Sequence, residues 1–267
     1  MRKNQILNFL FLFFILLAIF SGYKIISILT EYRSGENTYH EVQQYVHLPE
    51  TEAPTEKTTE PAADPEETEA ATEPEEDPIL FPEVDFDALL EVNEDVVAWV
   101  YIEDTNINYP VVRGKDNDRY LTTMIDGSYN GAGTIFMDYR NQPDLSDPHT
   151  ILYGHNMKNN TMFANILKYR DQEFYDAHPI GMLMTPEKNY QFEIITAYVA
   201  EPNESAWQLA FLSDEEALNW ALASMRRSAF SCDTVPALGD KFLTLSTCSY
   251  EFNDARFVLV GIVKEAG

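Results

Sequence analysis

Hydrophobic and polar residues divide the chain into an apolar start, a polar middle and a mixed remainder. The apolar start runs from Asn4 to Tyr23, twenty residues without a charged side chain, directly after Arg2 and Lys3. About twenty apolar residues are the length that an α-helix needs to cross a hydrocarbon core. A cleavable signal peptide is the alternative, but its apolar region is usually shorter and ends in small residues. The pattern predicts an uncleaved membrane helix within residues 1–30.

The polar middle, residues 31–78, consists of a juxtamembrane stretch and an acidic segment. From Pro49 to Pro78 the chain has 12 acidic residues, one lysine, six prolines, six threonines and no aromatic residue. Such a composition cannot bury enough apolar surface to offset the entropy of ordering. We therefore expect an extended, disordered linker.

The net charge of the chain is −26, and the acidic segment holds 11 of these charges. The remaining −15 is spread over a sequence without a basic cluster. Binding of nucleic acid requires a basic face for the phosphates, so we do not expect a nucleic-acid partner.

The mixed remainder, residues 79–267, contains short alternating apolar runs that are typical of β-strands, separated by turn-forming segments. Helical patterns interrupt the strands at 85–92, 162–169 and 214–228, and the last begins with a capping-box spacing at Ser213 and Glu216. The mixture predicts a mainly β domain, a barrel or a sandwich, with helical insertions. The predicted strands are 99–103, 107–112, 133–138, 150–155, 181–185, 190–199, 241–248 and 256–263.

Two predicted strands near the C-terminus place a thiol and a guanidinium at facing ends. The first strand ends at Cys248 and the second begins at Arg256, so an antiparallel return would bring these side chains together. An arginine that opens an apolar strand needs a partner for its charge, and a developing oxyanion is such a partner. The alternative is an arginine whose head group simply extends into solvent.

A histidine at the end of another predicted strand could join this pair. His155 follows a glycine that permits close backbone approach and precedes a polar loop, so we expect its ring to project at a barrel mouth. Taken singly, His155 could be an ordinary surface imidazole and Cys248 a small buried side chain. Taken with Arg256, they supply the nucleophile, the proton carrier and the cation that acyl transfer through a thioester requires.

The other cysteine and the histidines suggest no further chemistry. With two cysteines the chain is no disulfide-rich scaffold, and we expect Cys232 to be a free structural thiol, with a bridge to Cys248 as the alternative. The five histidines lack the spacing of metal ligands, so neither a metal nor another cofactor is expected.

Several segments of the domain resemble the motifs of one family, the class B sortases. TLSTC at 244–248, with Arg256 downstream, is similar to the active-site and arginine strands of that family, and YGHNM at 153–157 is similar to its histidine motif. The resemblance spans nearly the whole domain but not the linker. It also covers INYPVV at 107–112, KDNDRYL at 115–121, GTIFMDYRN at 133–141 and MFANILKYRD at 162–171.

The resemblance implies a closed eight-stranded β-barrel in which the helix between Ser213 and Ser228 matches the class B insertion. It implies a cysteine transpeptidase that cleaves a sorting signal after threonine in secreted proteins. Cys248 would form the thioester, His155 would act as general acid and then as base, and Arg256 would stabilise the oxyanion. The substrate groove would be lined by Asn117, Leu121, Tyr153, Ser246 and Thr247.

The implied partners are proteins that carry sorting signals and an amine of a peptidoglycan precursor or cross-bridge. The resemblance places the enzyme in a Gram-positive cell membrane, with its N-terminus inside and the domain on the wall side. In this arrangement we expect the acidic linker to lift the domain away from the membrane. Ser249 stands where some relatives have an acidic residue, which leaves the preference of that subsite open.

Two other functions remain open at this stage. A hydrolytic cysteine peptidase would use the same nucleophile without an amine acceptor. A non-catalytic, wall-associated binding module would keep only the fold. The sequence LPET at 48–51 resembles a sorting signal, but it lies far from the C-terminus within an acidic run, so we interpret it as a coincidence.

Overall fold

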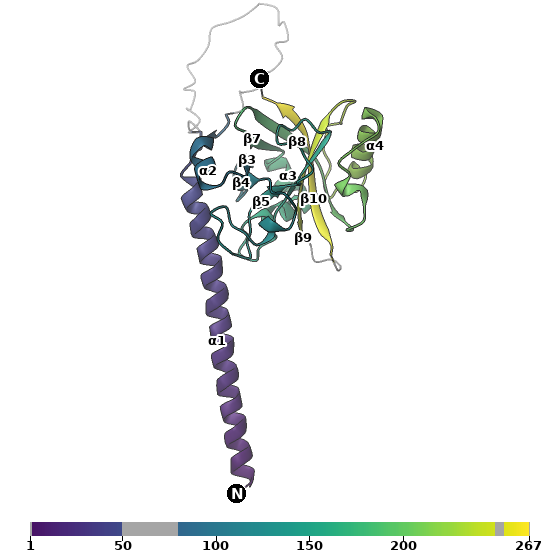
Figure 1. The fold of residues 1–267 in the computed structure, drawn as a ribbon. Coiled ribbons are helices and arrows are strands. Elements are labelled where there is room, and N and C mark those ends of the chain that lie inside the picture. Colours follow the sequence, from purple (N-terminus) through teal and green to yellow (C-terminus); the bar gives the residue numbers. More distant parts are fainter. Residues whose placement is uncertain (1, 50–79, 249–253, 267) are drawn as a thin grey trace, which may run out of the picture.

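The structure, a computed structural model, describes residues 2–49, 80–248 and 254–266. A long helix leads from the N-terminus to a β-barrel, and the C-terminus lies at the end of the barrel farther from the start of that helix (Figure 1). Most of the predicted acidic linker lies outside the described residues, as do Glu50 and Thr51 of the LPET sequence.

The β-barrel confirms the predicted fold. Eight strands of the described chain close in the order β10-β8-β7-β3-β4-β5-β6-β9. Two neighbouring pairs, β4 with β5 and β6 with β9, are parallel, and the other pairs are antiparallel. Each strand overlaps one predicted from the sequence. Their bounds are β3 (Val96–Tyr101), β4 (Asn108–Val112), β5 (Ile135–Met137), β6 (His149–Tyr153), β7 (Ile180–Met184), β8 (Asn189–Ala200), β9 (Lys241–Cys248) and β10 (Arg256–Glu265).

The three predicted helical segments are present, one of them in a tighter form. The segment predicted at 162–169 is a 3₁₀ helix, η2 (Phe163–Arg170), as is common in connections between larger elements. The predicted helix at 85–92 is α2 (Phe86–Val92), capped by Asp85, whose carboxylate accepts a hydrogen bond from the Ala88 N–H at 3.0 Å. The sequence did not predict α3 (Gln172–Ala177), η1 (Arg119–Leu121) or η3 (Ser205–Trp207).

The third helix, α4 (Asp214–Met225), covers one outer face of the barrel beside β8 and β10 (Figure 1). Ser213 caps its start by accepting a hydrogen bond from the Glu216 N–H at 3.3 Å. Trp220 packs in a cluster with Val258 and Val260 of β10. This cluster is the second apolar core of the domain, on the opposite face of the sheet from the Leu243 and Leu245 side chains of the main core.

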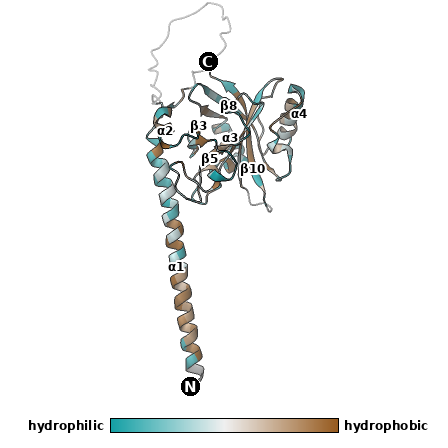
Figure 2. Cartoon of the chain, viewed as in Figure 1, coloured by the Kyte–Doolittle hydropathy of each residue, from teal (hydrophilic) through white to brown (hydrophobic). Residues whose placement is uncertain are grey.

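The N-terminal helix α1 (Arg2–Gln43) is longer than the predicted membrane helix. Its large exposed apolar side chains extend from Ile6 to Leu29, whereas Tyr39 and Val42 are buried against the barrel. Figure 2 shows this change from a hydrophobic lower part to a more hydrophilic part near the barrel. By length and composition α1 can cross a membrane, and the juxtamembrane residues that follow the apolar stretch continue the helix.

The chain after α1 joins the barrel before the acidic segment begins. Strand β1 (Val46–His47) pairs with β2 (Glu83–Val84), and the Asp85 N–H donates to the Tyr45 carbonyl at 2.9 Å. The expectation that the acidic linker lifts the domain from the membrane is therefore wrong. The described residues before and after the acidic segment belong to the same pair of strands, so the length of the segment cannot set the distance between α1 and the barrel.

His149, the first residue of β6, is a buried titratable group in the second core. Its ring nitrogens lie 2.7 Å from the Gln208 carbonyl oxygen and 2.7 Å from the Thr244 hydroxyl, and its ring centroid is 4.4 Å from that of Trp220. Burial lowers the pKa of His149 from 6.5 to about 4, and the hydrogen bond with Gln208 offsets only part of this effect. The neutral imidazole is thus the form that the folded domain contains at neutral pH.

We predict that His149 makes folding stability fall as the pH falls from 6.5 toward 4. The unfolded chain takes up a proton at His149 in this range and the folded chain does not, so the free energy of unfolding decreases by up to about 3 kcal/mol. The measurement is urea unfolding of the wild type and of His149→Asn at pH 7 and pH 4.5. The stability difference between the two proteins should narrow at pH 4.5, and an unchanged difference would contradict the prediction.

Candidate active site

The hairpin of β9 and β10 brings Cys248 and Arg256 together. Cys248 is the last residue of β9 and Arg256 is the first of β10, and the register of the antiparallel pair sets them directly opposite each other. Side chains at opposite positions of such a pair lie on the same face of the sheet, with Cβ atoms about 5 Å apart. Nη1 of Arg256 donates to the carbonyl oxygens of Asp254 and Ala255, at 3.1 and 3.2 Å, which holds the guanidinium at the start of β10.

The parallel pairing of β6 with β9 brings His155 to the same place. Tyr153 at the end of β6 lies opposite Ser246 of β9, and three hydrogen bonds continue the pairing beyond the strand end. The Gly154 N–H donates to the Ser246 carbonyl at 3.1 Å, and the Thr247 hydroxyl donates to the Gly154 carbonyl at 2.7 Å. The Asn156 amide then donates to the Cys248 carbonyl at 3.1 Å. His155 is thereby fixed between two residues that are bonded to β9.

Gly154 is required by the packing under the histidine. A Cβ atom at this position would lie 2.4 Å from Ile135 Cδ1 and 2.7 Å from Phe163 Cδ2, distances that real Cβ atoms do not adopt. Phe163 also donates its N–H to the His155 carbonyl at 3.0 Å. The absence of a side chain at Gly154 lets the histidine turn lie close against the barrel.

The ring of His155 is held by the backbone of Leu121. Its Nε2 atom lies 2.7 Å from the Leu121 carbonyl oxygen. Because a carbonyl oxygen can only accept, Nε2 carries the hydrogen in this contact, and Nδ1 of the neutral ring has a free lone pair. Nδ1 is therefore the nitrogen that can exchange a proton with a reacting group.

One pocket of about 280 Å³ contains all eight site residues predicted from the sequence. Phe136 and Gly154 complete its lining. The side-chain oxygen of Ser246 is buried beside this pocket without a hydrogen-bond partner in the described chain. The predicted residues in the lining are Asn117, Leu121, Tyr153, His155, Ser246, Thr247, Cys248 and Arg256.

A buried carboxylate that the sequence did not reveal anchors two of these residues. Asp138 accepts hydrogen bonds from the Asn117 amide at 3.0 Å and from the Tyr153 hydroxyl at 3.1 Å. Arg140 binds it with two donors, at 2.9 and 2.8 Å. Burial would raise the pKa of Asp138, but the hydrogen bonds from Arg140 and Asn117 outweigh it and lower the pKa below its usual value. Burial and the nearby Asp138 charge raise the pKa of Tyr153, which therefore stays a neutral donor.

The other candidate groups stay apart from this pocket. Cys232 and Cys248 are both free thiols, and Cys232 donates to the Ile195 carbonyl at 3.3 Å. Burial raises the pKa of the Cys232 thiol, which favours its unreactive form. Within the described residues, no three histidine, cysteine, aspartate or glutamate side chains are grouped as a metal site.

Comparison with known proteins identifies the family. The family model of the sortase domain matches residues 100–263. Sortase B of Listeria monocytogenes is 35% identical over 175 residues, which are 65% of this chain and 71% of that protein. The chain belongs to the sortase family, class B. It is accordingly a cysteine transpeptidase.

Solved structures of sortase B, one of them a substrate complex from Staphylococcus aureus, share the barrel of this sortase. A structure described as a sortase B–substrate complex has a TM-score of 0.65 and 31% identity, covering 68% of this chain and 85% of that one. A structure of sortase B complexed with triglycine has a TM-score of 0.65 and 32% identity, covering 68% of this chain and 86% of that one.

We predict that Gly154→Ala disables this sortase through the histidine turn. The added methyl group must displace Ile135, Phe163 or the backbone, which costs about 1–3 kcal/mol in a packed core and moves His155. Transpeptidase turnover should fall by roughly tenfold or more, because a small misplacement of a reacting group has a large effect on rate. Gly22→Ala, where an added methyl group contacts nothing within 4 Å, is the control. Full turnover in both variants would contradict the prediction.

Proposed function

We propose that this sortase cleaves a sorting signal after its threonine, holds the new acyl end as a thioester on Cys248 and transfers it to a peptidoglycan amine. The observation that carries the proposal is the convergence of Cys248, His155 and Arg256 in one pocket, with His155 Nδ1 free. A thiolate nucleophile, a proton carrier and a fixed cation are the parts that this acyl transfer requires.

In the first half of the reaction the Cys248 thiolate attacks the carbonyl carbon of the threonine. The carbonyl electrons move to oxygen, and Arg256 stabilises the resulting oxyanion. When the oxyanion collapses, the C–N bond breaks, and protonated His155 gives its proton to the leaving amine. The products are a thioester on Cys248 and the released C-terminal fragment.

In the second half an amine takes the place of the leaving group. Neutral His155 accepts a proton from the incoming amine as its nitrogen attacks the thioester carbon. The C–S bond then breaks and restores the Cys248 thiolate, while a new amide bond joins the sorted protein to the amine. A peptidoglycan precursor or cross-bridge is the source of amine that fits the triglycine complex of a sortase B relative.

The lining of the pocket suits an extended peptide. Phe136 and Tyr153 form an aromatic pair, with ring centroids 5.3 Å apart, that can contact apolar parts of a peptide. The Asn117 side chain and the unpartnered Ser246 hydroxyl can bond to its backbone. The complex of Staphylococcus aureus sortase B with a substrate supports this pocket as the place for a peptide substrate.

The proposed location is the cell membrane of a Gram-positive bacterium. Helix α1 would cross the membrane once, with its N-terminus inside and the catalytic domain on the wall side. The charges beside the apolar stretch do not decide this direction, since Arg2 and Lys3 are matched by Lys24 and Arg33. Sorting signals and wall amines are both found outside the membrane, and this location gives the pocket access to them.

The test of this function is a reaction of the full chain in detergent with a peptide that carries a sorting signal, with and without triglycine. Mass spectrometry should show a thioester on Cys248 without triglycine and a peptide–triglycine product with it. Cys248→Ala should give neither. Hydrolysis alone at every triglycine concentration would favour a cysteine peptidase, and a cellular sorting phenotype retained by Cys248→Ala would favour a binding module.

We predict that Arg256→Lys lowers kcat by roughly 100-fold and changes KM little. Lysine keeps the charge but loses the planar pair of donors that a guanidinium offers to an oxyanion. Steady-state kinetics with the peptide and triglycine measure both constants. The same substitution at the exposed Arg226 should leave kcat unchanged. A wild-type kcat in Arg256→Lys would show that the guanidinium does not stabilise the transition state.

A further inference from the structure

One ridge of α1 meets a single barrel loop next to the active site. Glu31, Gly35 and Tyr39 are spaced four residues apart, so they share one face of the helix. The Glu31 carboxylate accepts from the Gly131 N–H at 2.8 Å, and its carbonyl accepts from the Asn130 amide at 2.9 Å. Gly35 is buried against Asn130. The ridge thus lies on the loop segment 130–133.

Tyr39 makes the innermost of these contacts. Its side chain is 5% exposed, and its hydroxyl donates a hydrogen bond to the Gly133 carbonyl. Its ring packs edge to face on Tyr109, with centroids 5.1 Å apart. The Tyr109 hydroxyl in turn accepts from the Met162 N–H at 3.0 Å, next to the Phe163 N–H that binds the His155 carbonyl.

The segment that Tyr39 holds is hydrogen-bonded to the residues on either side of Leu121, whose carbonyl group orients His155. Gly133 has φ +59°, and a Cβ atom there would lie 2.3 Å from the Tyr120 carbonyl oxygen and 2.7 Å from that of Leu121. The Thr134 N–H donates to the Tyr120 carbonyl at 3.0 Å, and the Asn130 N–H donates to the Thr122 carbonyl at 3.0 Å. A shift of segment 130–134 therefore moves residues 120–122, including the carbonyl that accepts from His155.

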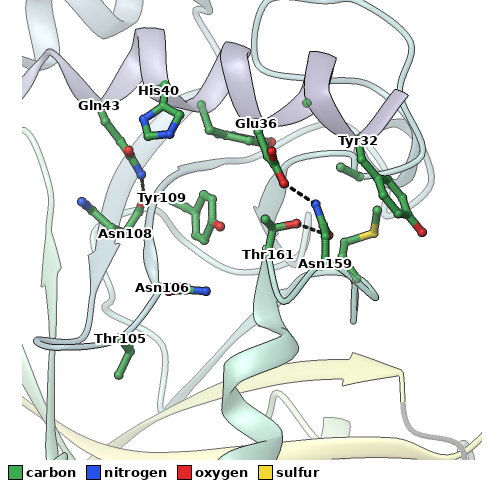
Figure 3. A pocket seen from close by; sticks show the side chains of 14 residues that line it. Tyr32, Glu36, His40, Gln43, Thr105, Asn106, Asn108, Tyr109, Asn159 and Thr161 are labelled. Atoms are coloured by element: carbon green, nitrogen blue, oxygen red, sulfur yellow. Dashed lines mark hydrogen bonds between the residues drawn. The ribbon is translucent and has the colours of Figure 1, made fainter. Parts of the chain in front are cut away.

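Beside Tyr39, part of the interface between α1 and the barrel is open and polar, whereas Val42 packs in the main core. A cavity of about 310 Å³ lies beside Tyr39, lined by α1, β4 and the loop after His155 (Figure 3). Across it, Gln43 donates to the Asn108 carbonyl at 3.1 Å, and Asn159 donates to the Glu36 carboxylate at 2.8 Å. Because this part of the interface lacks continuous apolar packing, the contacts between α1 and the barrel here depend on individual hydrogen bonds.

We propose that residues 31–43 of α1 are a positioning element of the catalytic domain, and that Tyr39 fixes the Leu121 carbonyl through Gly133 and so holds His155 in its reactive orientation. Tyr39 is a positioning residue, since it touches no substrate. The proposal rests on the proposed role of His155 as the proton carrier. It gives the membrane helix a part in catalysis besides anchoring.

The test compares Tyr39→Phe with Tyr32→Phe in the full chain, in detergent. Both changes remove one hydroxyl from the same helix, but Tyr32 forms no hydrogen bond in the described part of the chain. In Tyr39→Phe we expect kcat to fall roughly 3- to 10-fold at constant KM, because the hydrogen bond that fixes segment 130–134 is lost. Tyr32→Phe should match the wild type.

Nitrogen NMR of the His155 ring shows whether Tyr39 orients this ring or only adds to the folding stability of the domain. In a Cys248→Ala background, Tyr39→Phe should reduce the Nε2–H tautomer of neutral His155 and Tyr32→Phe should not. The proposal would be overturned if Tyr39→Phe had a lower Tm than the wild type but the same kcat and the same fraction of the His155 Nε2–H tautomer. Full activity of His155→Ala would instead refute the proposed function, and the tautomer would still report whether Tyr39 orients the ring.

Discussion

The parallel pairing of β6 with β9 is the constraint on which the active site depends. Parallel neighbours end at the same edge of a sheet, so the residues after β6 and the last residues of β9 meet without a long connection between them. The antiparallel partner β10 then begins opposite the end of β9. Cys248 and Arg256 lie at the ends of β9 and β10, and His155 follows the end of β6, so all three are positioned by one continuous sheet whose closure keeps these strands in register.

Around this arrangement, polar groups fix the side chains that would otherwise rotate freely. The Leu121 carbonyl holds the His155 ring, and buried Asp138 holds Asn117 and Tyr153. The negative charge of buried Asp138 is compensated by Arg140, which donates two hydrogen bonds to its carboxylate. Groups oriented in advance need no rearrangement when charge develops in a reaction, which is the main physical advantage of such a site.

Local patterns were enough to predict the barrel strands and the grouping of Cys248, His155 and Arg256, because alternation and strand ends are sequence properties. The other predicted residues of the pocket came from the resemblance to class B sortases. Local patterns did not predict the continuation of α1, since residues 31–43 are polar and are held by contacts with the barrel. Strands β1 and β2 have two residues each, too few for a pattern, so the sequence did not predict that the segments before and after the acidic linker pair with each other. Asp138 and His149 are buried partners of distant residues, and such partners cannot be recognised from neighbours in sequence.

The most direct test of the central claim is a crystal structure of the chain acylated at Cys248 by a substrate analogue. The account predicts an acyl oxygen about 3 Å from the Arg256 guanidinium. It also predicts that His155 keeps Nε2 on the Leu121 carbonyl and directs Nδ1 toward the acyl carbon. An acyl oxygen bound elsewhere, or an imidazole turned away from the thioester, would contradict the account.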